Sequence, residues 1–417
     1  MSSLPIEEPD LFVADEPLVW DLLPAGQQPD WQDHPSYPAV RRALLAAAPL
    51  VRPEEVAELH RSLAVVAAGG ARLLQAGDCA ESLAEQDAEH LAAKVSVLDA
   101  LGDHLAARTG QEVVRIGRLG GQFAKPRSAP TERHGDLELP VFRGHLVNSE
   151  EPTPEARRHD PRRMLLAHRA GLRAFDHLRR LRGERAAGAP RGLTPGLLPG
   201  LITGPWGSHE ALVIDYEGPL VRPATEGGAE YLASTHLPWI GERTRQPDSA
   251  HVEMMATVRN PLACKIGPTA RPDEVVRLCD LLDPERTPGR LTLVLRFGRA
   301  RVEEVMPGLV DAVRRAGHPV VWLTDPMHGN TVRTADGTKT RQLRAVTEEA
   351  AAFLRILERR GLHAGGLHLE TAAADVTECL GGTTGDERAL HRRYETLCDP
   401  RLNPEQAHEL IETLFRS

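Results

Sequence analysis

The feature that most constrains the fold of this chain is a pattern that recurs from residue 71 onward: a short apolar run, a polar cluster, and then a segment with helical spacing. The runs that we interpret as strands are residues 71–75, 113–116, 201–203, 235–240, 263–266, 291–295, 320–324 and 366–369. Strands that alternate with helices are typical of an α/β protein with a parallel sheet. Eight of them predict a closed (β/α)8 barrel, or TIM barrel.

The order within each repeat locates the chemistry. The polar cluster follows the apolar run in nearly every case, and barrels of this kind keep their active sites at the carboxyl ends of the strands. An open, doubly wound sheet is the structural alternative, but it would gather its chemistry at one switch point. The spread of chemically active residues over nearly every strand end therefore favours the barrel.

The chain ahead of the repeats reads as a helical extension. Helical spacing covers residues 37–47 and 53–68, and Pro53 followed by two glutamates is a favourable helix start. We therefore expect two parts, an N-terminal extension over residues 1–70 and a barrel domain over residues 71–417. Two regions are read as connections: residues 131–163, and the Gly/Pro-rich residues 182–199, which show no periodicity.

The composition favours small-molecule partners. The chain has 50 basic and 59 acidic residues, a net charge of −9, which disfavours nonspecific binding to nucleic acid or to an anionic membrane. No lysine or arginine precedes Arg41, which is unlike a signal peptide, and no run approaches the ~18 apolar residues of a membrane span. Five widely spread cysteines, an odd number, indicate a reduced, cytoplasmic protein.

Lysine is rare in this chain. Among the 50 basic residues the only lysines are Lys94, Lys125, Lys265 and Lys339, and the last three lie in Gly/Pro-rich, turn-like settings. A compact ammonium differs chemically from a guanidinium fork, so a chain that otherwise uses arginine is expected to keep lysine where that difference matters. Solvated loop positions are the alternative explanation.

Four residues after predicted strands are candidate metal ligands. Cys79, His328 and Glu370 each follow an apolar run, and Asp399 lies in the segment beyond the last run. One thiolate, one imidazole and two carboxylates suit Mn²⁺, Co²⁺, Fe²⁺ or Zn²⁺ and leave room for a substrate oxygen. For any one of these residues, an ordinary buried side chain is the competing interpretation.

The same strand ends carry many candidate anion-binding residues. They are Arg118, Lys125, Arg127, Ser128, Arg243, Arg245, Lys265 and Arg296. This is more positive charge than one carboxylate needs, and it indicates two phosphates, or a phosphate and a carboxylate. Gly120 and Gly121 are expected to let the backbone approach such an anion. A ring of solvated loop cations is the alternative.

At these residues the chain resembles the type II 3-deoxy-D-arabino-heptulosonate 7-phosphate (DAHP) synthases. The motifs that carry the resemblance are GDCAES, RLGGQFAKPRS, GSHEALVIDYE, WIGERTRQPDSAHVE, RNPLACKIGPT, TDPMHGNT, DGTKTR, GGLHLE, DVTECLGG and YETLCDPRLN. They run in order from Gly77 to Asn403, roughly three quarters of the chain. The resemblance implies a metal-dependent barrel that condenses phosphoenolpyruvate with D-erythrose 4-phosphate and water and releases phosphate, the first step of the shikimate pathway.

The resemblance also implies roles for individual residues. The metal ligands fall on Cys79, His328, Glu370 and Asp399, with Mn²⁺ or Co²⁺ preferred over Zn²⁺ or Fe²⁺. The phosphoenolpyruvate contacts fall on Arg118, Glu242, Arg243, Lys265 and Arg296, of which Lys265, Glu242 and Arg296 are the expected catalytic residues. The erythrose phosphate contacts fall on Lys125, Arg127 and Ser128. Glu242 or Lys265 would position or deprotonate the attacking water, and the sequence does not choose between them.

The resemblance further suggests how the enzyme is regulated. Members with elaborate feedback control carry extra helices between the segment that here ends near Leu181 and the GSHEA motif, an interval that is only the linker in this chain. We therefore expect a short form, as in phenazine-type secondary metabolism, with weak or absent inhibition by aromatic amino acids. A cytoplasmic homo-oligomer, a dimer or larger, is expected; a non-catalytic paralogue that partners another shikimate enzyme is the alternative.

Cys398, beside Asp399, raises a separate hypothesis. If the metal site forms, Cys398 comes close to Cys79 and the two thiols could oxidise together in the absence of metal. A reduced, buried cysteine is the competing interpretation.

Overall fold

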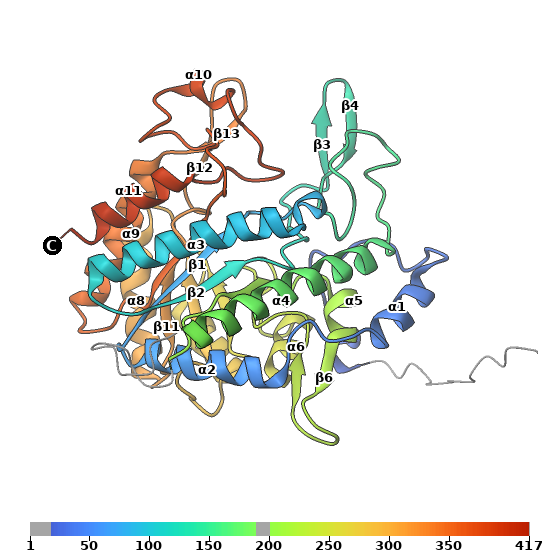
Figure 1. Cartoon of the computed structure of the whole chain (residues 1–417), viewed down its shortest axis with the longest axis horizontal. Coiled ribbons are helices and arrows are strands. Elements are labelled where there is room, and N and C mark those ends of the chain that lie inside the picture. Colours follow the sequence, from blue (N-terminus) through green and yellow to red (C-terminus); the bar gives the residue numbers. More distant parts are fainter. Residues whose placement is uncertain (1–17, 189–200, 417) are drawn as a thin grey trace, which may run out of the picture.

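The computed structural model describes residues 18–188 and 201–416, and it contains a closed barrel of eight parallel strands (Figure 1). In ring order the strands are β1 (Arg72–Gly77), β2 (Val113–Arg118), β5 (Trp206–Glu210), β8 (Leu237–Ile240), β9 (Leu262–Ile266), β10 (Leu291–Leu295), β11 (Val321–Thr324) and β14 (Gly366–Glu370). Every pairing around the ring is parallel and follows chain order. The predicted (β/α)8 barrel is therefore confirmed.

Helices surround the barrel and cover its outer, apolar face. They are α3 (Ala88–Thr109), α4 (Arg163–Gly188), α6 (Ala250–Thr257), α7 (Pro272–Leu282), α8 (Val302–Arg315), α9 (Leu343–Glu358) and α11 (Pro404–Leu414), with the short helix α5 (Ile214–Glu217). The short helix α10 (Glu387–Leu390) stands above the strands in Figure 1. α8 shows why they form: Val302, Met306 and Val310 recur at helical spacing and are buried. The helix ends before Gly317, which has a φ of +77°.

The N-terminal extension packs against the barrel, and its helix α2 covers one end of it. It contains the 3₁₀ turn Val19–Leu22, α1 (Tyr37–Leu45) and α2 (Pro53–Ala67), close to the predicted helices. Leu59, Leu63 and Val66 of α2 lie in one buried cluster with strand residues such as Leu73. α2 and the hairpin of β6 (Val221–Pro223) and β7 (Glu230–Leu232) lie at the amino-terminal end of the strands, at the bottom of Figure 1. The boundary at residue 70 stays a prediction.

Two further hairpins stand at the opposite, carboxyl-terminal end of the barrel. β3 (Thr131–His134) pairs with β4 (Leu137–Pro140), and β12 (Thr331–Arg333) pairs with β13 (Lys339–Arg341). Both project above the strands in Figure 1. They place additional side chains around the end of the barrel at which the sequence predicts chemistry.

The predicted third strand is wrong in position. Residues 201–203 are not a strand, and the barrel strand is β5 (Trp206–Glu210), whose residues are all buried. Its polar side chains have buried partners: Ser208 donates to the Gly117 carbonyl at 2.9 Å, and His209 Nε2 lies 2.8 Å from Glu217 of α5. Because buried polar groups are tolerated when they are hydrogen-bonded, this strand lacks the apolar run that identifies the others.

The predicted linker over residues 182–199 is also wrong at its start. α4 continues through residue 188, because Arg182 pairs with Glu55 of α2 and Arg185 pairs with Asp99 of α3. These ion pairs to neighbouring helices hold the last turns of α4 in place. Residues 189–199 lie outside the described residues.

We predict that substitution of Gly366 by alanine lowers the free energy of unfolding by about 3 kcal/mol. Gly366 has a φ of +152°, and a Cβ at this position would overlap the Leu73 carbonyl of the adjacent strand β1. The matched control is Gly183→Ala on α4, where nothing lies within 4 Å of an added Cβ; it should raise stability by about 0.5–1 kcal/mol. Urea unfolding of both variants tests this, and equal effects would contradict it.

Candidate active site

A cavity of 210 Å³ opens at the carboxyl ends of the barrel strands. Its lining residues are Lys125, Pro126, Arg127, Ser128, Glu210, Gly241, Glu242, Arg243, Lys265, Arg296, His328, Thr331, Lys339 and Asp399. Most of the predicted substrate and metal residues thus face one space. Arg118, Cys79 and Glu370 are buried, with at most 1% exposure; Lys125 of the cavity wall contacts Glu370 and Cys79, and Arg118 contacts Glu370 behind it.

Glu370 lies at the centre of the cluster beside the cavity. β1 pairs with β14 and β2 so that Gly77 stands between Glu370 and Arg118, and this residue without a side chain lets the two charged groups meet. Arg118 Nη2 and Lys125 Nζ lie 3.1 and 3.0 Å from Glu370 Oε1, respectively. Burial opposes ionisation, but His328, Lys125 and Arg341 together hold the pKa of Glu370 well below its usual range. The group therefore stays ionised at neutral pH.

Three of the predicted metal ligands come together here. One ligand atom each of His328, Glu370 and Asp399 lies within 4.8 Å of the other two. His328 Nε2 is 3.0 Å from Glu370 Oε1, and Lys125 Nζ is 3.4 Å from Asp399 Oδ2. Cys79 is outside this group of three but adjacent to it, because its Sγ accepts the Asp399 backbone amide at 3.4 Å.

The protonation states of these groups fit a divalent cation. Burial lowers the pKa of His328, which favours the neutral imidazole, and Lys125 and Lys339 outweigh burial to hold the pKa of Asp399 low. For Cys79, burial is outweighed by a hydrogen bond with Cys398 and by the Lys125 ammonium, which lower the thiol pKa to about 6. Metal ligands must be deprotonated, so an imidazole, two carboxylates and a thiolate are present in their ligating forms.

Asp325 orients His328 from behind. Asp325 Oδ2 lies 2.7 Å from His328 Nδ1 and 2.8 Å from Lys265 Nζ. A carboxylate on one ring nitrogen directs the other nitrogen outward, which is the usual second partner of a metal-binding histidine. The line of polar contacts continues inward, because Lys265 Nζ is 3.2 Å from His368 Nε2 and Gln75 holds the other ring nitrogen of His368 at 2.7 Å. Burial lowers the pKa of Lys265 although Asp325 opposes this effect.

A second group of polar side chains stands on another side of the cavity. Arg243 donates to Ser128 Oγ at 2.6 Å, so the structure places Arg243 with the predicted erythrose phosphate residues. Arg127 lies in the same run and pairs with Glu132 of β3 at 3.2 Å. Arg296 reaches the other side of the cavity, where its Nη2 donates to the His328 carbonyl at 3.1 Å.

Two predicted anion contacts are wrong. Arg245 does not line the cavity; it pairs with both carboxylate oxygens of Glu242 at 3.0 Å and with Glu274 at 2.7 Å. The backbone amides of Gly120 and Gly121 point at an anion, but that anion is the buried carboxylate of Glu81, at 3.1 and 2.9 Å. In both cases a carboxylate of the chain itself takes the place that the sequence suggested for a ligand.

Two cations hold the metal-binding carboxylates in a way that the sequence did not predict: Arg341 was not identified, and Lys339 was singled out as a rare lysine but not assigned a partner. Arg341 lies 2.8 Å from Glu370 Oε2, and Lys339 lies 2.9 Å from Asp399 Oδ1. Both are on β13, two residues apart, and alternate residues of a strand share a face. The signal for them was the DGTKTR motif, in which the spacing of the two cations is visible but their partners are not.

Cys79 and Cys398 lie in one small buried cluster with Ala80 and Phe142, and both thiols are free. Cys398 Sγ accepts a hydrogen bond from Arg127 Nη1 at 3.3 Å. Their oxidation to a disulfide stays a prediction.

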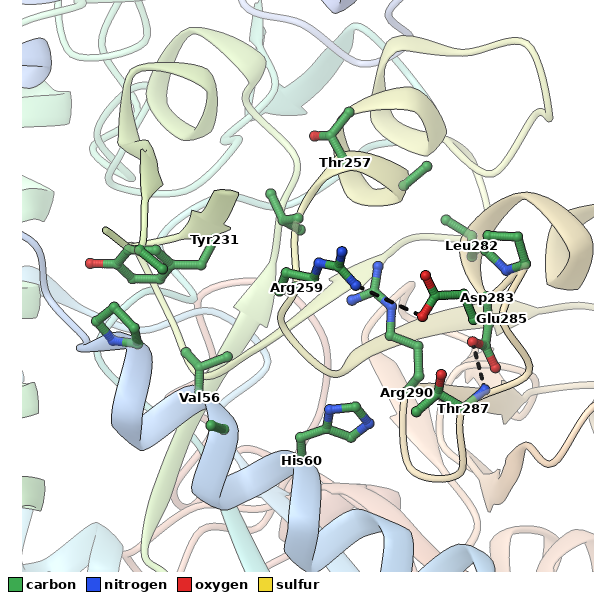
Figure 2. Close-up of a pocket in the computed structure, with 16 residues that line it drawn as sticks. Val56, His60, Tyr231, Thr257, Arg259, Leu282, Asp283, Glu285, Thr287 and Arg290 are labelled. Atoms are coloured by element: carbon green, nitrogen blue, oxygen red, sulfur yellow. Dashed lines mark hydrogen bonds and ion pairs between the residues drawn. The ribbon is translucent and has the colours of Figure 1, made fainter. Parts of the chain in front are cut away.

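A larger cavity, of 420 Å³, lies at the other end of the barrel, next to α2 and the starts of β9 and β10 (Figure 2). None of the predicted site residues lines it. Its charged groups mainly hold the backbone: Arg290 donates to the Met255 carbonyl at 3.0 Å, and Asp283 accepts the Thr287 amide at 2.9 Å. Chemistry is therefore assigned to the smaller cavity, where the ionised groups converge.

The chain belongs to the Class-II DAHP synthetase family, whose profile matches residues 15–189 and 202–414. A probable phospho-2-dehydro-3-deoxyheptonate aldolase of Pseudomonas fluorescens is 46% identical over 92% of this chain and 92% of its own. The corresponding enzyme of Streptomyces coelicolor is 40% identical over 94% of this chain and 95% of its own. Phospho-2-dehydro-3-deoxyheptonate aldolase AroG of Mycolicibacterium smegmatis is 38% identical over 93% and 91%, respectively.

Family membership gives the activity. The enzyme condenses phosphoenolpyruvate with D-erythrose 4-phosphate to DAHP, the first step of the shikimate pathway, and the family is metal-dependent. Among the described residues, no helix has the length and apolar character needed to cross a membrane.

We predict that Arg341→Met lowers the free energy of unfolding by about 3 kcal/mol, because it leaves a fully buried carboxylate with one partner fewer. The matched variant is Lys339→Met on the same face of β13. Its side chain is 26% exposed, whereas that of Arg341 is 0% exposed, so it should cost about 1 kcal/mol or less. Chemical unfolding at neutral pH measures both, and equal losses would show that burial of the Glu370 pair is not what stabilises this region.

Proposed function

We propose that the condensation takes place in the 210 Å³ cavity, with a divalent metal held by Cys79, His328, Glu370 and Asp399. The observation that carries this proposal is the convergence of His328, Glu370 and Asp399 within 4.8 Å, in the protonation states that a metal requires. Mn²⁺ or Co²⁺ is the metal that the family resemblance favours, and the set of two carboxylates, one imidazole and one thiolate also suits Zn²⁺ or Fe²⁺. When bound, the metal supplies Lewis-acid polarisation of the erythrose aldehyde.

Phosphoenolpyruvate is assigned to the inner part of the cavity. Its carboxylate and phosphate need cations, and Arg118, Lys265 and Arg296 surround the metal-binding residues from β2, β9 and the end of β10. Erythrose phosphate is assigned to Lys125, Arg127 and Ser128, which follow β2. The hydrogen bond between Arg243 and Ser128 supports a role for Arg243 at the border of the two substrates.

This arrangement brings the reacting atoms together. The C3 carbon of phosphoenolpyruvate forms a bond with the aldehyde carbon, water adds at C2, and the resulting hemiketal phosphate expels inorganic phosphate. Of the two candidates for handling the proton of that water, Lys265 is favoured. Lys265 lines the cavity and burial lowers its pKa from the ordinary value, whereas both carboxylate oxygens of Glu242 accept hydrogen bonds from Arg245. Glu242 then serves to position the substrate and Arg245.

We further propose that the enzyme is a cytoplasmic homo-oligomer, a dimer or larger. The odd number of cysteines, all free, supports a reducing compartment. The exposed Val19 and Leu22 of the extension, 62% and 75% accessible, support a role for that extension in contacts between subunits. Light scattering of the purified protein measures the oligomeric state.

His328→Ala and Cys79→Ser are expected to weaken metal binding by more than about 100-fold, beyond the range seen when only an outer partner of a ligand is lost. Turnover of phosphoenolpyruvate should fall with it, while the circular dichroism spectrum is unchanged. Metal content by atomic emission and activity after metal addition measure both effects. The control is Cys279→Ala on α7, remote from the cavity, which should keep metal and activity; normal activity in His328→Ala would refute the assignment.

We also predict weak or absent feedback inhibition by phenylalanine, tyrosine and tryptophan. The interval between Leu181 and Gly207 is short, and its first seven residues are taken up by the end of α4. This leaves little chain for additional regulatory helices and fits a short form of secondary metabolism. The purified enzyme, assayed with each amino acid alone and with all three together, should retain most of its activity. Tight inhibition by any of them would overturn the prediction.

A further inference from the structure

The loops that follow β10 and β11 meet backbone to backbone. Gly298 follows Arg296 by two residues, and Gly329 follows His328 directly. A Cβ on Gly298 would come within 2.7 Å of the Gly329 carbonyl oxygen, and a Cβ on Gly329 would overlap the Gly298 backbone. The two loops can approach this closely only because neither residue has a side chain. Their junction therefore sets how the Arg296 side chain lies relative to His328.

Glu349 of α9 lies under this junction and bonds to both loops. Its side chain is buried, with 1% exposure. Oε1 accepts the backbone amides of Phe297 and Gly298 at 2.8 and 2.9 Å, and Oε2 accepts the side-chain amide of Asn330 at 2.6 Å. One carboxylate thus holds the loop of Arg296 with one oxygen and the loop of His328 with the other.

Asn330 completes the connection. Its Nδ2 also donates to the Pro326 carbonyl at 2.8 Å, and its Oδ1 accepts the Arg299 amide at 3.1 Å. The Asn330 side chain therefore ties Glu349 to the backbone on the amino-terminal side of His328. It also forms a second bridge to the loop after β10.

The electrostatics of Glu349 are unusual for a residue that only packs. Among residues 18–188 and 201–416, no lysine, arginine or histidine forms an ion pair with it, and burial, with a smaller contribution from Asp325, raises its pKa to about 7. A buried carboxylate without a cation is costly, and its cost is offset only by the hydrogen bonds it accepts. Those bonds all go to the two loops.

We infer that Glu349 is a positioning residue that fixes the phosphoenolpyruvate anchor Arg296 relative to the metal ligand His328. This inference rests on the roles proposed above for those two residues. A reaction that joins two substrates depends on their alignment, and a displacement of about 1 Å costs on the order of 100-fold in rate. Glu349 thus sets the distance between Arg296, which holds phosphoenolpyruvate, and His328, which holds the metal beside the aldehyde.

Glu349→Gln tests the inference with little change in shape. The amide can keep one oxygen toward Phe297 and Gly298, but it then presents an NH₂ group to the NH₂ group of Asn330. We expect kcat/KM to fall about 100-fold, KM for phosphoenolpyruvate to rise, and the affinity for Mn²⁺, measured by calorimetry without substrate, to fall about 10-fold. The matched control is Glu358→Gln, at the end of the same helix α9, whose side chain is exposed; it should behave as the wild type.

Asn330→Ala provides a second variant if Glu349→Gln does not fold. It removes the link to the His328 loop but leaves the bonds of Glu349 to Phe297 and Gly298, so Mn²⁺ affinity should fall more than KM for phosphoenolpyruvate rises. Wild-type Mn²⁺ affinity and KM in both variants, with or without a lower Tm, would overturn the inference. His328→Ala distinguishes failure of the proposed metal site from failure of the proposed role of Glu349. If His328→Ala still binds Mn²⁺, the metal-site assignment is wrong. If His328→Ala loses Mn²⁺ but Glu349→Gln binds it normally, only the role of Glu349 is refuted.

Discussion

The buried carboxylate of Glu370 is the group on which the arrangement of the active site depends. It lies at the end of β14 with no exposure, and a carboxylate in such a place is stable only when cations surround it. Arg118 and Lys125 on the β2 side and Arg341 from β13 are these cations, and the imidazole of His328 from the loop after β11 lies beside them. The charge of Glu370 is therefore stabilised only when four segments of the chain, β14, the end of β2, β13 and the loop after β11, lie together.

The barrel fold brings these segments together without special arrangements of the chain. The strands end at the same end of the barrel, and the hairpin of β12 and β13, which stands above them in Figure 1, carries Lys339 and Arg341. Asp325 then fixes His328 and Lys265 together, and Glu349 fixes the loops of Arg296 and His328 from the outer layer of helices. The apolar barrel carries the fold, while buried carboxylates set the positions of the groups that act on the substrates.

Much of this could be predicted from the sequence, and the failures have physical reasons. The sequence predicts strands such as β10 and β11 because their apolar residues are consecutive, and it groups Cys79, His328 and Glu370 because strand ends meet in a barrel. β5 was misplaced because its Ser208 and His209 are buried with partners that the sequence does not reveal. Arg341 and Glu81 were missed as site-forming residues for the same reason: their roles come from pairing across long sequence distances.

The most direct test of the proposed site is the position of a bound metal in a crystal. Crystals grown with Mn²⁺ and phosphoenolpyruvate, measured at the manganese absorption edge, should give an anomalous peak in contact with Cys79, His328, Glu370 and Asp399. Density for phosphoenolpyruvate should lie against Lys265 and Arg296. An anomalous peak elsewhere, or a manganese ion that contacts neither His328 nor Glu370, would contradict the site described above.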